Sequence, residues 1–458
     1  AFDPSAFGSS PFQGSSDKCF IEKTPTSLPA IYHLKRYKCS LNFQHNESSN
    51  KLQLHHYLFT FNIYFSVKIL FVITQPFDPE TGGVQMTTFK LSNYFLESGQ
   101  EVKVFSFQKD NHANYEPVPL EHAKDFGNYQ NLDNQAHFRA KIQSFRPNVV
   151  INQMPYELKI GQMLLEEKNK LDFFLLGCLR NSLFSVKLNI DDYSSGLLPS
   201  PFNKLFFNPV GRFVFQQLHK RKHAAQLRRF MDTYDRYIMF AEPNFEEMRY
   251  FIGTYKEEKW TLIPNSIPDT LAEVPPKEKV LLYLGRLSIA QKRSDLLLPL
   301  WKRIKDELPD WKFWVVGDGD YKAVMEQQVR EESIERITFF GRKPPYPFYE
   351  KAPILIMTSA FEGFPNVIVE AQSRAVVPVV MNSYPIAEWL LQNSKNGCLI
   401  KPFHIDKMAV QIIDLLHSEL KLKEMQQASL ENARKFTIDK VGKQWLQLFD
   451  EALTHKTT

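Results

Sequence analysis

An alternation of short apolar runs and helical stretches, which begins at Val280, restricts the fold of this chain more than any other feature. Short runs without a polar face, separated by helices, are typical of buried strands in a parallel sheet that helices cover on both sides. The sequence therefore predicts an α/β domain with a doubly wound parallel sheet in this half. The predicted strands are Val280–Gly285, Phe313–Gly317, Ile337–Gly341, Pro353–Thr358, Val377–Met381 and Cys398–Ile400.

The same pattern precedes this region. Val67–Ile73 is predicted as a buried strand, Met86–Ser98 as a helix that Gly99 ends, and Glu101–Phe107 as a second strand. Gly82 and Gly83 fall in the first strand-to-helix loop, where glycine lets the backbone approach a ligand closely. The fingerprint G-x-G-x-x-G is missing from this loop, which argues against a dinucleotide enzyme. Further strands are predicted at Val149–Asn152, Phe173–Cys178 and Tyr237–Phe240.

The organisation expected is two Rossmann-like domains and two terminal pieces. Residues 1–65 have no sustained periodicity and no initial Met, so we expect an extension without a packed core, read through from upstream of the true start. A folded but poorly patterned appendage is the alternative. Residues 66–265 would form the first domain and residues 266–437 the second, joined by the Pro-marked linker Asn265–Pro276. Residues 438–458 would form a closing helix.

Composition excludes several classes of protein. The net charge of +5 arises from 56 basic and 51 acidic residues, which is too small an excess to indicate nucleic-acid binding. The four cysteines are far apart, and this usage fits a reducing cytoplasm better than secretion. Tyr57–Ile73 is short for a membrane span and contains Asn62 and Lys68, so a strand explains its apolar end better.

One basic segment leaves two interpretations open. Leu218–Phe230 is rich in Lys and Arg, and it follows Phe206, Phe207, Phe213 and Phe215. A solvated basic helix face explains it, and so does peripheral contact with an anionic membrane at the inner face.

The stretch Pro353–Ala371 carries the main candidate site. Its strand leads into a small, turn-forming loop, and Asn366–Ala375 is predicted as a helix with Pro365 in its first turn. Loops of this kind bind anions at the carboxyl edge of open α/β sheets. Glu362 and Glu370 bracket the loop and helix start, and eight helical positions span roughly 12 Å. Free amides could therefore bind phosphate while the two carboxylates hold hydroxyls at either end.

Two cations are expected at the same edge. The strand from Val280 ends in Gly285 and Arg286, and Lys292 follows shortly after. Arg286 and Lys292 would bind a pyrophosphate opposite the helix start; the alternative is that either caps a helix or pairs with Asp295. Asp318-x-Asp320 resembles a metal site of another glycosyltransferase fold, but its position after a parallel strand favours a glycine turn and no metal.

Taken in order, these motifs resemble the retaining glycosyltransferases of family 4, which have the two-domain GT-B fold. The resemblance runs from about Val67 to Leu453. It rests on GGVQ at Gly82, IPNSI at Ile263, GRL and QKR at Gly285 and Gln291, VVGDGD at Val315, FFG at Phe339 and FEGFPNVIVEA at Phe361.

The resemblance implies roles by position. Glu362 would bind the hydroxyls of the donor sugar, and Glu370 the ribose of the nucleotide. Arg286 and Lys292 would neutralise the diphosphate leaving group in place of a metal, so neither a metal nor a cofactor is expected. Further donor-binding residues would be Gly83, Gly285, Gly363, Phe364, Pro365 and Asn366, with backbone amides facing the donor at Gly83 and along the stretch Gly363–Asn366, apart from Pro365, which has no N–H. The last helix, Ile438–Leu453, would cross back to the first domain.

The sequence departs from the family at one place. A histidine often follows the strand ending near Cys178, whereas this chain has Arg180 and Asn181, so these are only a weak indication of an acceptor-side contact. Arginine cannot act as a general base at neutral pH.

The expected activity is transfer of a hexose, with retention, from a nucleotide diphosphate sugar, for which the resemblance suggests uridine. The acceptor would be a glycan or lipid-linked hydroxyl in bacterial polysaccharide or glycoconjugate synthesis. A non-catalytic nucleotide-sugar or glycan binding protein and a sugar-nucleotide epimerase are the rivals.

Overall fold

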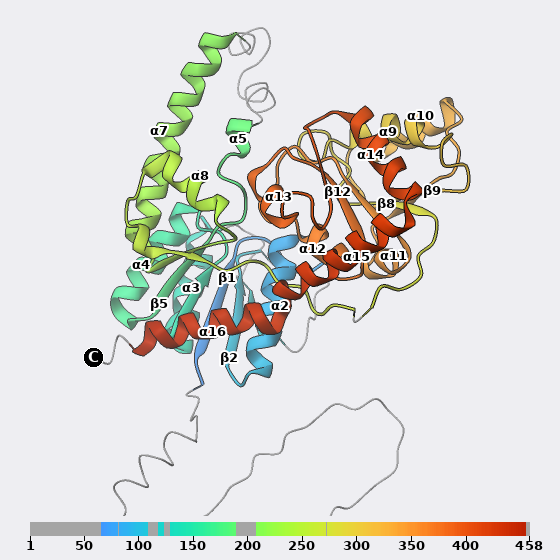
Figure 1. Cartoon of the computed structure of the whole chain (residues 1–458). Coiled ribbons are helices and arrows are strands. Elements are labelled where there is room, and N and C mark those ends of the chain that lie inside the picture. The colour runs from blue at the N-terminus through green and yellow to red at the C-terminus, as the bar shows by residue number, and fades with distance from the viewer. Residues whose placement is uncertain are drawn as a thin grey trace, which may run out of the picture. The chain divides into compact units, whose positions relative to one another are not determined.

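The structure is a computed structural model, and it describes residues 66–80, 82–108, 118–122, 129–188, 208–271 and 273–454 (Figure 1). The extension predicted for residues 1–65 lies outside these residues, as do Phe206 and Phe207.

The first half of the described chain forms a seven-stranded, all-parallel sheet with the order β3-β2-β1-β4-β5-β6-β7. We call this sheet and its helices the N-terminal lobe. The strands are β1 (Lys68–Ile73), β2 (Glu101–Ser106), β3 (Leu120–His122), β4 (Val149–Asn152), β5 (Phe174–Cys178), β6 (Arg236–Met239) and β7 (Trp260–Leu262). The helices are α2 (Gly83–Glu97), α3 (Leu132–Phe145), α4 (Leu158–Leu171), α5 (Ser185–Leu188), α7 (Pro209–Thr233) and α8 (Pro243–Ile252), with a 3₁₀ turn at Glu257–Lys259.

The second half forms a six-stranded parallel sheet with the order β10-β9-β8-β11-β12-β13, here called the C-terminal lobe with its helices. Its strands are β8 (Val280–Leu284), β9 (Lys312–Val316), β10 (Ile337–Gly341), β11 (Ile354–Met357), β12 (Val377–Met381) and β13 (Cys398–Ile400). Its helices are α9 (Leu297–Ile304), α10 (Lys322–Glu331), α11 (Tyr346–Lys351), α12 (Asn366–Gln372), α13 (Pro385–Leu390), α14 (Ile405–His417) and α15 (Glu419–Ala433), with 3₁₀ turns at Ser294–Leu296 and Arg434–Phe436.

The predicted strands are confirmed, with ends that differ by at most one residue, whereas β3, β7, α3 and α4 were not identified in advance. Two predicted helix boundaries were wrong. Helix α2 begins at Gly83 instead of Met86, because Gly82 is extended and takes the N-cap position. Helix α12 begins after Pro365, so this proline precedes the first turn, and the helix ends at Gln372, before Ala375 turns into the left-handed region.

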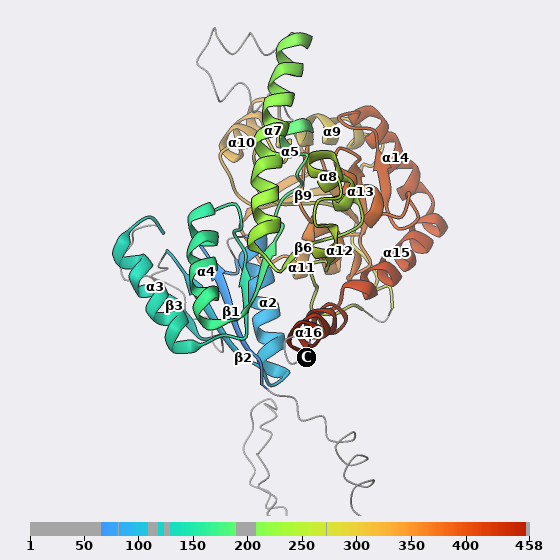
Figure 2. The same ribbon diagram turned by 90° about the vertical axis from the view of Figure 1, so that its left-hand side faces the viewer.

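The last helix, α16 (Ile438–Thr454), returns to the N-terminal lobe as expected and packs on α2 (Figure 2). The rings of Phe95 and Phe449 lie 5.4 Å apart at this contact. Gly442 faces Tyr94 so closely that a Cβ there would lie 2.1 Å from a ring carbon. The two helices can therefore approach only because this position is glycine.

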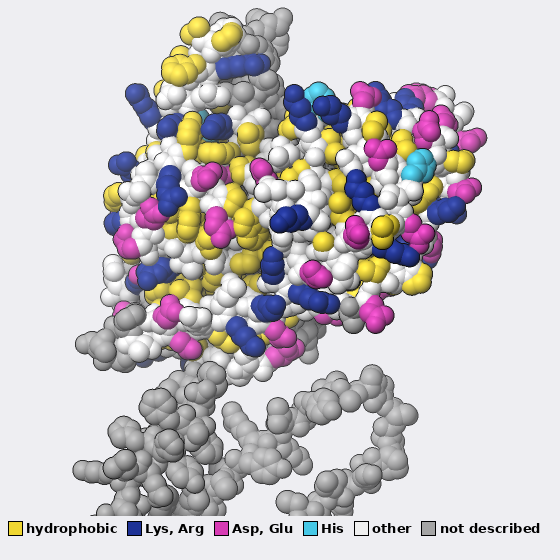
Figure 3. Space-filling model, in the orientation of Figure 1, with side chains coloured by type: hydrophobic (Ala, Val, Ile, Leu, Met, Phe, Trp, Pro, Cys, Tyr) yellow, Lys and Arg dark blue, Asp and Glu magenta, His cyan; other side chains and the backbone are white. Residues whose placement is uncertain are grey.

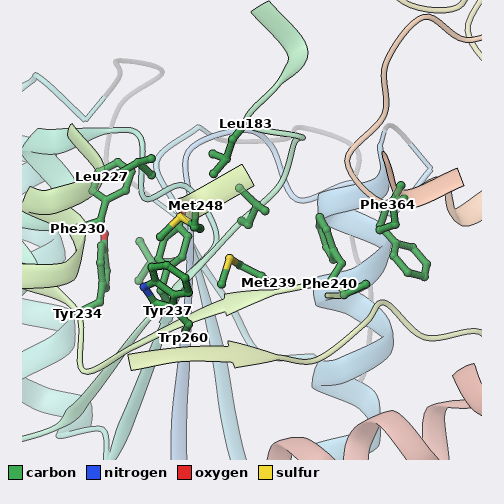
Figure 4. Close-up of a cluster of buried hydrophobic side chains, with 14 of the residues drawn as sticks. Leu183, Leu227, Phe230, Tyr234, Tyr237, Met239, Phe240, Met248, Trp260 and Phe364 are labelled. Carbon is green, nitrogen blue, oxygen red and sulfur yellow. The ribbon is translucent and has the colours of Figure 1, made fainter. Parts of the chain in front are cut away.

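A hydrophobic core lies between the N-terminal sheet and its helices α7 and α8, and it continues into the C-terminal lobe (Figure 4). Phe230, Tyr237 and Trp260 belong to its first part. Phe364, from the loop before α12, lies against Phe240 with 5.5 Å between ring centroids. Burial of this aromatic pair stabilises one arrangement of the two lobes.

Within the described ranges, no helix has both the length and the apolar character needed to cross a bilayer. The end of the apolar stretch Tyr57–Ile73 is strand β1, which lies inside the sheet between β2 and β4 as predicted.

Candidate active site

The strand order places one reversal point in each sheet. Chain connections diverge between β1 and β4 in the N-terminal lobe and between β8 and β11 in the C-terminal lobe. Open α/β sheets bind ligands beyond the carboxyl ends of the strands at such points. The loops that leave these strands carry Gly83, Gly285 and Glu362, so the topology brings candidate residues to both reversal points.

The start of α2 meets the start of α12. A Cβ on Gly83 would lie 3.3 Å from Nδ2 of Asn366, so a larger side chain would press on that amide. Asn265 Nδ2 donates to Asn366 Oδ1 at 3.0 Å from the opposite side. The first amides of a helix have no partner within it, and the helix dipole favours an anion there. The first turn of α2 is therefore suited to a phosphate.

The loops after β8 and β11 are joined by several hydrogen bonds. The Ala360 amide donates to the Gln291 carbonyl at 2.7 Å, and the Lys292 ammonium lies 2.6 Å from Glu362 Oε1. Lys292 and Glu362 expose only 18% and 8% of their side chains, so this ion pair is largely buried. The expected proximity of the two residues is confirmed. Their roles toward a donor remain predictions.

Asp295 does not pair with Lys292. Its carboxylate accepts from Arg293, with Nη2 to Oδ2 at 2.8 Å, so the pairing with Asp295 weighed for Lys292 was wrong. Arg286 is exposed at the same edge, and its backbone carbonyl accepts from the Tyr283 hydroxyl at 2.8 Å. Its guanidinium is therefore accessible to a ligand.

Glycines allow the β9 loop to lie directly against the loop of Gly285. A Cβ on Gly317 would lie 1.9 Å from the Gly285 carbonyl oxygen, and one on Gly319 would lie 2.2 Å from that of Leu287. Both glycines also have positive φ angles, 140° and 158°. Asp318 Oδ1 accepts from the Gly319 amide at 2.8 Å. The glycine turn expected at this motif is thus required by backbone packing.

Glu370 connects the two lobes. Its side chain is about nine-tenths buried on α12, and Oε1 lies 3.1 Å from the ammonium of Lys90 on α2. The Tyr349 hydroxyl is 3.4 Å from Oε2, and burial followed by the nearby carboxylate holds the pKa of Tyr349 well above its usual value. Sequence reasoning missed Lys90 and Tyr349. Lys90 is seven residues after Gly83, on the same face of α2, so helical spacing offered a signal.

The acceptor-side candidates lie against the loop of Glu362. A Cβ on Gly363 would be 2.4 Å from the Arg180 carbonyl oxygen and 2.9 Å from Asn181 Cα. Nε and Nη2 of Arg180 are buried and have no hydrogen-bond partner among the described residues. Burial lowers the pKa of this guanidinium. The side-chain amide of Gln153, directly after β4, is also buried and has no hydrogen-bond partner within the part of the chain that the structure describes.

Comparison with known proteins agrees with this geometry. Residues 272–436 match the family described as glycosyl transferases group 1. The matched segment contains Arg286, Lys292 and Glu362, from the two loops that meet at the C-terminal reversal point, and Glu370 from α12.

Among curated proteins, the chain is similar to an uncharacterized glycosyltransferase of Haemophilus influenzae, with 30% identity over 189 residues, 40% of this chain and 51% of the relative. It is also similar to an N-acetylgalactosaminyltransferase of Campylobacter jejuni that is named for a diphosphate-undecaprenol-linked glycan substrate, with 27% identity over 38% of this chain and 49% of the relative. The chain spans about half the length of the curated relatives that it matches.

Solved structures resemble a larger part of the chain. HepE from Anabaena, in complex with UDP and glucose, superposes with a TM-score of 0.63 over 84% of this chain and 100% of its own length, at 18% identity. TarM from S. aureus gives a TM-score of 0.62 over 84% and 99%, at 14% identity. The fold of the chain is GT-B, with two Rossmann-like sheets and a last helix that returns to the N-terminal lobe.

Proposed function

We propose that this protein is a retaining glycosyltransferase that moves a hexose from a nucleotide diphosphate sugar to a hydroxyl of a glycan or lipid-linked acceptor. One observation carries the proposal. The ion pairs of Glu362 with Lys292 and of Glu370 with Lys90 lie on the loop before α12 and on α12 itself, and the start of α12 meets the start of α2 at Asn366 and Gly83. Such a donor requires carboxylates that bind the hydroxyls of its sugars, and cations and free amides that bind its diphosphate.

In this proposal, the diphosphate binds at the first turn of α2 and is neutralised by Arg286 and Lys292. The Lys292 ammonium has three donors and uses one on Glu362, so two remain for phosphate oxygens. As the glycosidic bond breaks, negative charge grows on the leaving diphosphate, and fixed cations in a largely dry site stabilise it. Neither a metal nor a cofactor is required for this step.

Glu370 would hold the ribose diol, and Glu362 the hydroxyls of the transferred sugar. Lys90 and Tyr349 fix the Glu370 carboxylate, while Lys292 and Gln291 fix that of Glu362. Carboxylates with fixed orientation lose little freedom when they bind hydroxyls, which favours productive geometry.

We place the acceptor at the carboxyl edge of the N-terminal sheet, near Gln153, Arg180 and Asn181. The buried, unpartnered nitrogens of Arg180 and amide of Gln153 support this, because buried polar groups require partners. UDP in the HepE structure and the lipid-linked substrate named for the Campylobacter relative support a UDP-sugar and a bacterial glycoconjugate acceptor. We place the protein in the cytoplasm, which fits both a nucleotide-sugar donor and the small number of cysteines.

The test is thermal unfolding with a panel of nucleotide diphosphates and their sugars, with and without EDTA, followed by donor turnover. We expect one diphosphate to raise Tm in the presence of EDTA and Glu370→Ala to abolish the shift. Arg286→Ala and Lys292→Ala should lower turnover about 10²- to 10³-fold with the fold intact. Arg330→Ala, an exposed arginine on α10 of the same lobe, is the matched control and should behave as the unmodified chain.

Two results would contradict the proposal. Turnover near normal in both cation variants would remove their role at the diphosphate. A Tm shift without donor hydrolysis or transfer, for every donor and acceptor offered, would favour the non-catalytic binding protein.

A further inference from the structure

Helix α7 has an outer face with an unusual composition. Its exposed residues recur at intervals of three and four, so they form one stripe along the helix. From the start of the helix, these residues are Pro209, Val210, Phe213, Val214, Gln217, Leu218, Arg221, Lys222, Ala225, Arg228, Arg229 and Asp232. The first half of the stripe is apolar and the second half is basic. A solvent-facing stripe in a globular protein is normally polar along its whole length.

The side chains in the apolar half of the stripe are highly exposed to solvent. Val210, Phe213 and Leu218 expose 73%, 61% and 59% of their surface. They lie on the part of α7 that projects away from the sheet, where hydrophobic side chains are visible in Figure 3. Contiguous exposed apolar residues of this kind mark an interaction surface.

The charge of the helix points to an anionic partner. Between Pro209 and Met231 the chain has no Asp or Glu, and its basic residues are Arg212, Lys220, Arg221, Lys222, Arg228 and Arg229. A helix with apolar residues beside a group of Lys and Arg, and with a single acidic residue, Asp232, which pairs with Lys256, has the chemistry that binds the boundary of an anionic bilayer.

Packing of the opposite face fixes which side of α7 is presented. His223 lies 4.9 Å from the Phe251 ring on α8, and Lys220 lies 4.0 Å over the Tyr250 ring. Leu227 and Phe230 belong to the basic segment Leu218–Phe230, for which membrane contact was one interpretation, but both are buried on this inner side. The apolar stripe therefore cannot turn inward without loss of these contacts.

We propose that the outer face of α7 docks on the surface of an anionic lipid bilayer. Val210, Phe213, Val214 and Leu218 enter the headgroup region, and Arg221, Lys222, Arg228 and Arg229 contact lipid phosphates. This surface is separate from the residues assigned to donor binding, and the inference does not depend on the transfer reaction. It would place the N-terminal lobe at the membrane, where a lipid-linked acceptor resides.

The experiment is sedimentation of the full chain with vesicles, without donor or acceptor. One set contains phosphatidylcholine alone, and the other contains phosphatidylcholine with phosphatidylglycerol. We expect binding to the anionic vesicles only, weakened by salt. Arg221→Gln with Lys222→Gln should weaken it about 30-fold, which corresponds to about 1 kcal/mol per basic residue. Phe213→Ser with Val214→Ser should also reduce it at least tenfold, as loss of buried apolar area requires.

The matched control is Val324→Ser with Val410→Ser, which removes two exposed valines from the C-terminal lobe and should leave binding unchanged. Thermal unfolding establishes that each variant is folded. Equal binding to both vesicle types, no binding to either, or unchanged binding of the α7 variants would overturn the proposal. Self-association that Phe213→Ser with Val214→Ser abolishes, in the absence of vesicle binding, would assign the surface to a second copy instead.

Discussion

The ion pair between Lys90 and Glu370 offers the sharpest test of how the two lobes are held. Lys90 lies on α2 of the N-terminal lobe and Glu370 on α12 of the C-terminal lobe, with 3.1 Å between the charged atoms. Lys90→Met keeps the length and the apolar part of the side chain and removes only the charge. Glu370 would then keep the Tyr349 hydroxyl and lose its cation.

The burial of the pair determines the size of the effect. The two side chains expose 12% and 10% of their surface, so water replaces the lost cation poorly. Removal of one partner from a buried pair costs about 3–5 kcal/mol. Since some exposure remains at both groups, we expect about 3 kcal/mol of lost free energy of unfolding. The double variant Lys90→Met with Glu370→Gln should recover part of it, because no unpaired charge is left.

Urea unfolding of the two single variants and the double variant measures the coupling energy, and calorimetric titration of UDP measures the consequence for the site. A Glu370 carboxylate without Lys90 is less well oriented, and we expect UDP to bind about tenfold more weakly, which corresponds to about 1.4 kcal/mol. Lys103→Met is the control, since Lys103 and Glu121 pair at 3.2 Å within one lobe with 33% and 24% exposure. This more exposed pair should contribute less than about 1 kcal/mol and leave UDP binding unchanged.

A coupling energy no larger than that of Lys103 with Glu121 would refute the reasoning. Unchanged UDP affinity with a large loss of stability would show instead that the pair supports the fold and has no part in the donor site.

Four further variants test other parts of the structure. Gly363→Ala should lower donor turnover about 10²-fold, because its Cβ would lie 2.4 Å from the Arg180 carbonyl oxygen and must displace the loop by about 1 Å; Gly83→Ala, with 3.3 Å of room, should be milder in the same assay. Burial and then His219 lower the pKa of His223 to about 4. The unfolded state therefore binds more protons between about pH 4 and 6.5, and stability falls by up to about 3 kcal/mol as pH falls through this window. In acid denaturation, His223→Phe should remove that dependence, and an unchanged profile would contradict the assignment. Tyr349→Phe should cost about 1 kcal/mol in UDP binding by calorimetry, with no change expected in the unfolding of the N-terminal lobe.

Much of the fold could be predicted because buried strands of parallel sheets leave a direct signal in sequence. Val149–Asn152, Ile337–Gly341 and Val377–Met381 were placed to the residue, since each is an apolar run between turn-forming residues. Strand β3 was missed because its three residues, Leu120–His122, are half-buried and include Glu and His. The start of α2 was wrong because a glycine N-cap has no side chain that marks the helix start.

The residues of the candidate site could likewise be predicted only in part. Glu362, Glu370, Arg286 and Lys292 were identified because each follows a strand whose end lies at one edge of the sheet. Lys90 gave no comparable signal, because a lysine on a helix normally lies in solvent. The partner of Lys292 was also beyond sequence reasoning, which offered Asp295 three residues away, whereas the structure supplies Glu362 from seventy residues further along the chain.

The sequence by itself determined the two parallel sheets and the chemical groups at the carboxyl edge of the C-terminal sheet, since periodicity and turn residues are local properties. Only the tertiary structure decided which charges meet across the lobes, that Gly363 lies against Arg180, and which face of α7 is exposed. The physical reason is that these contacts join residues far apart in the chain. Their geometry depends on how the lobes and helices pack, and local sequence does not specify this packing.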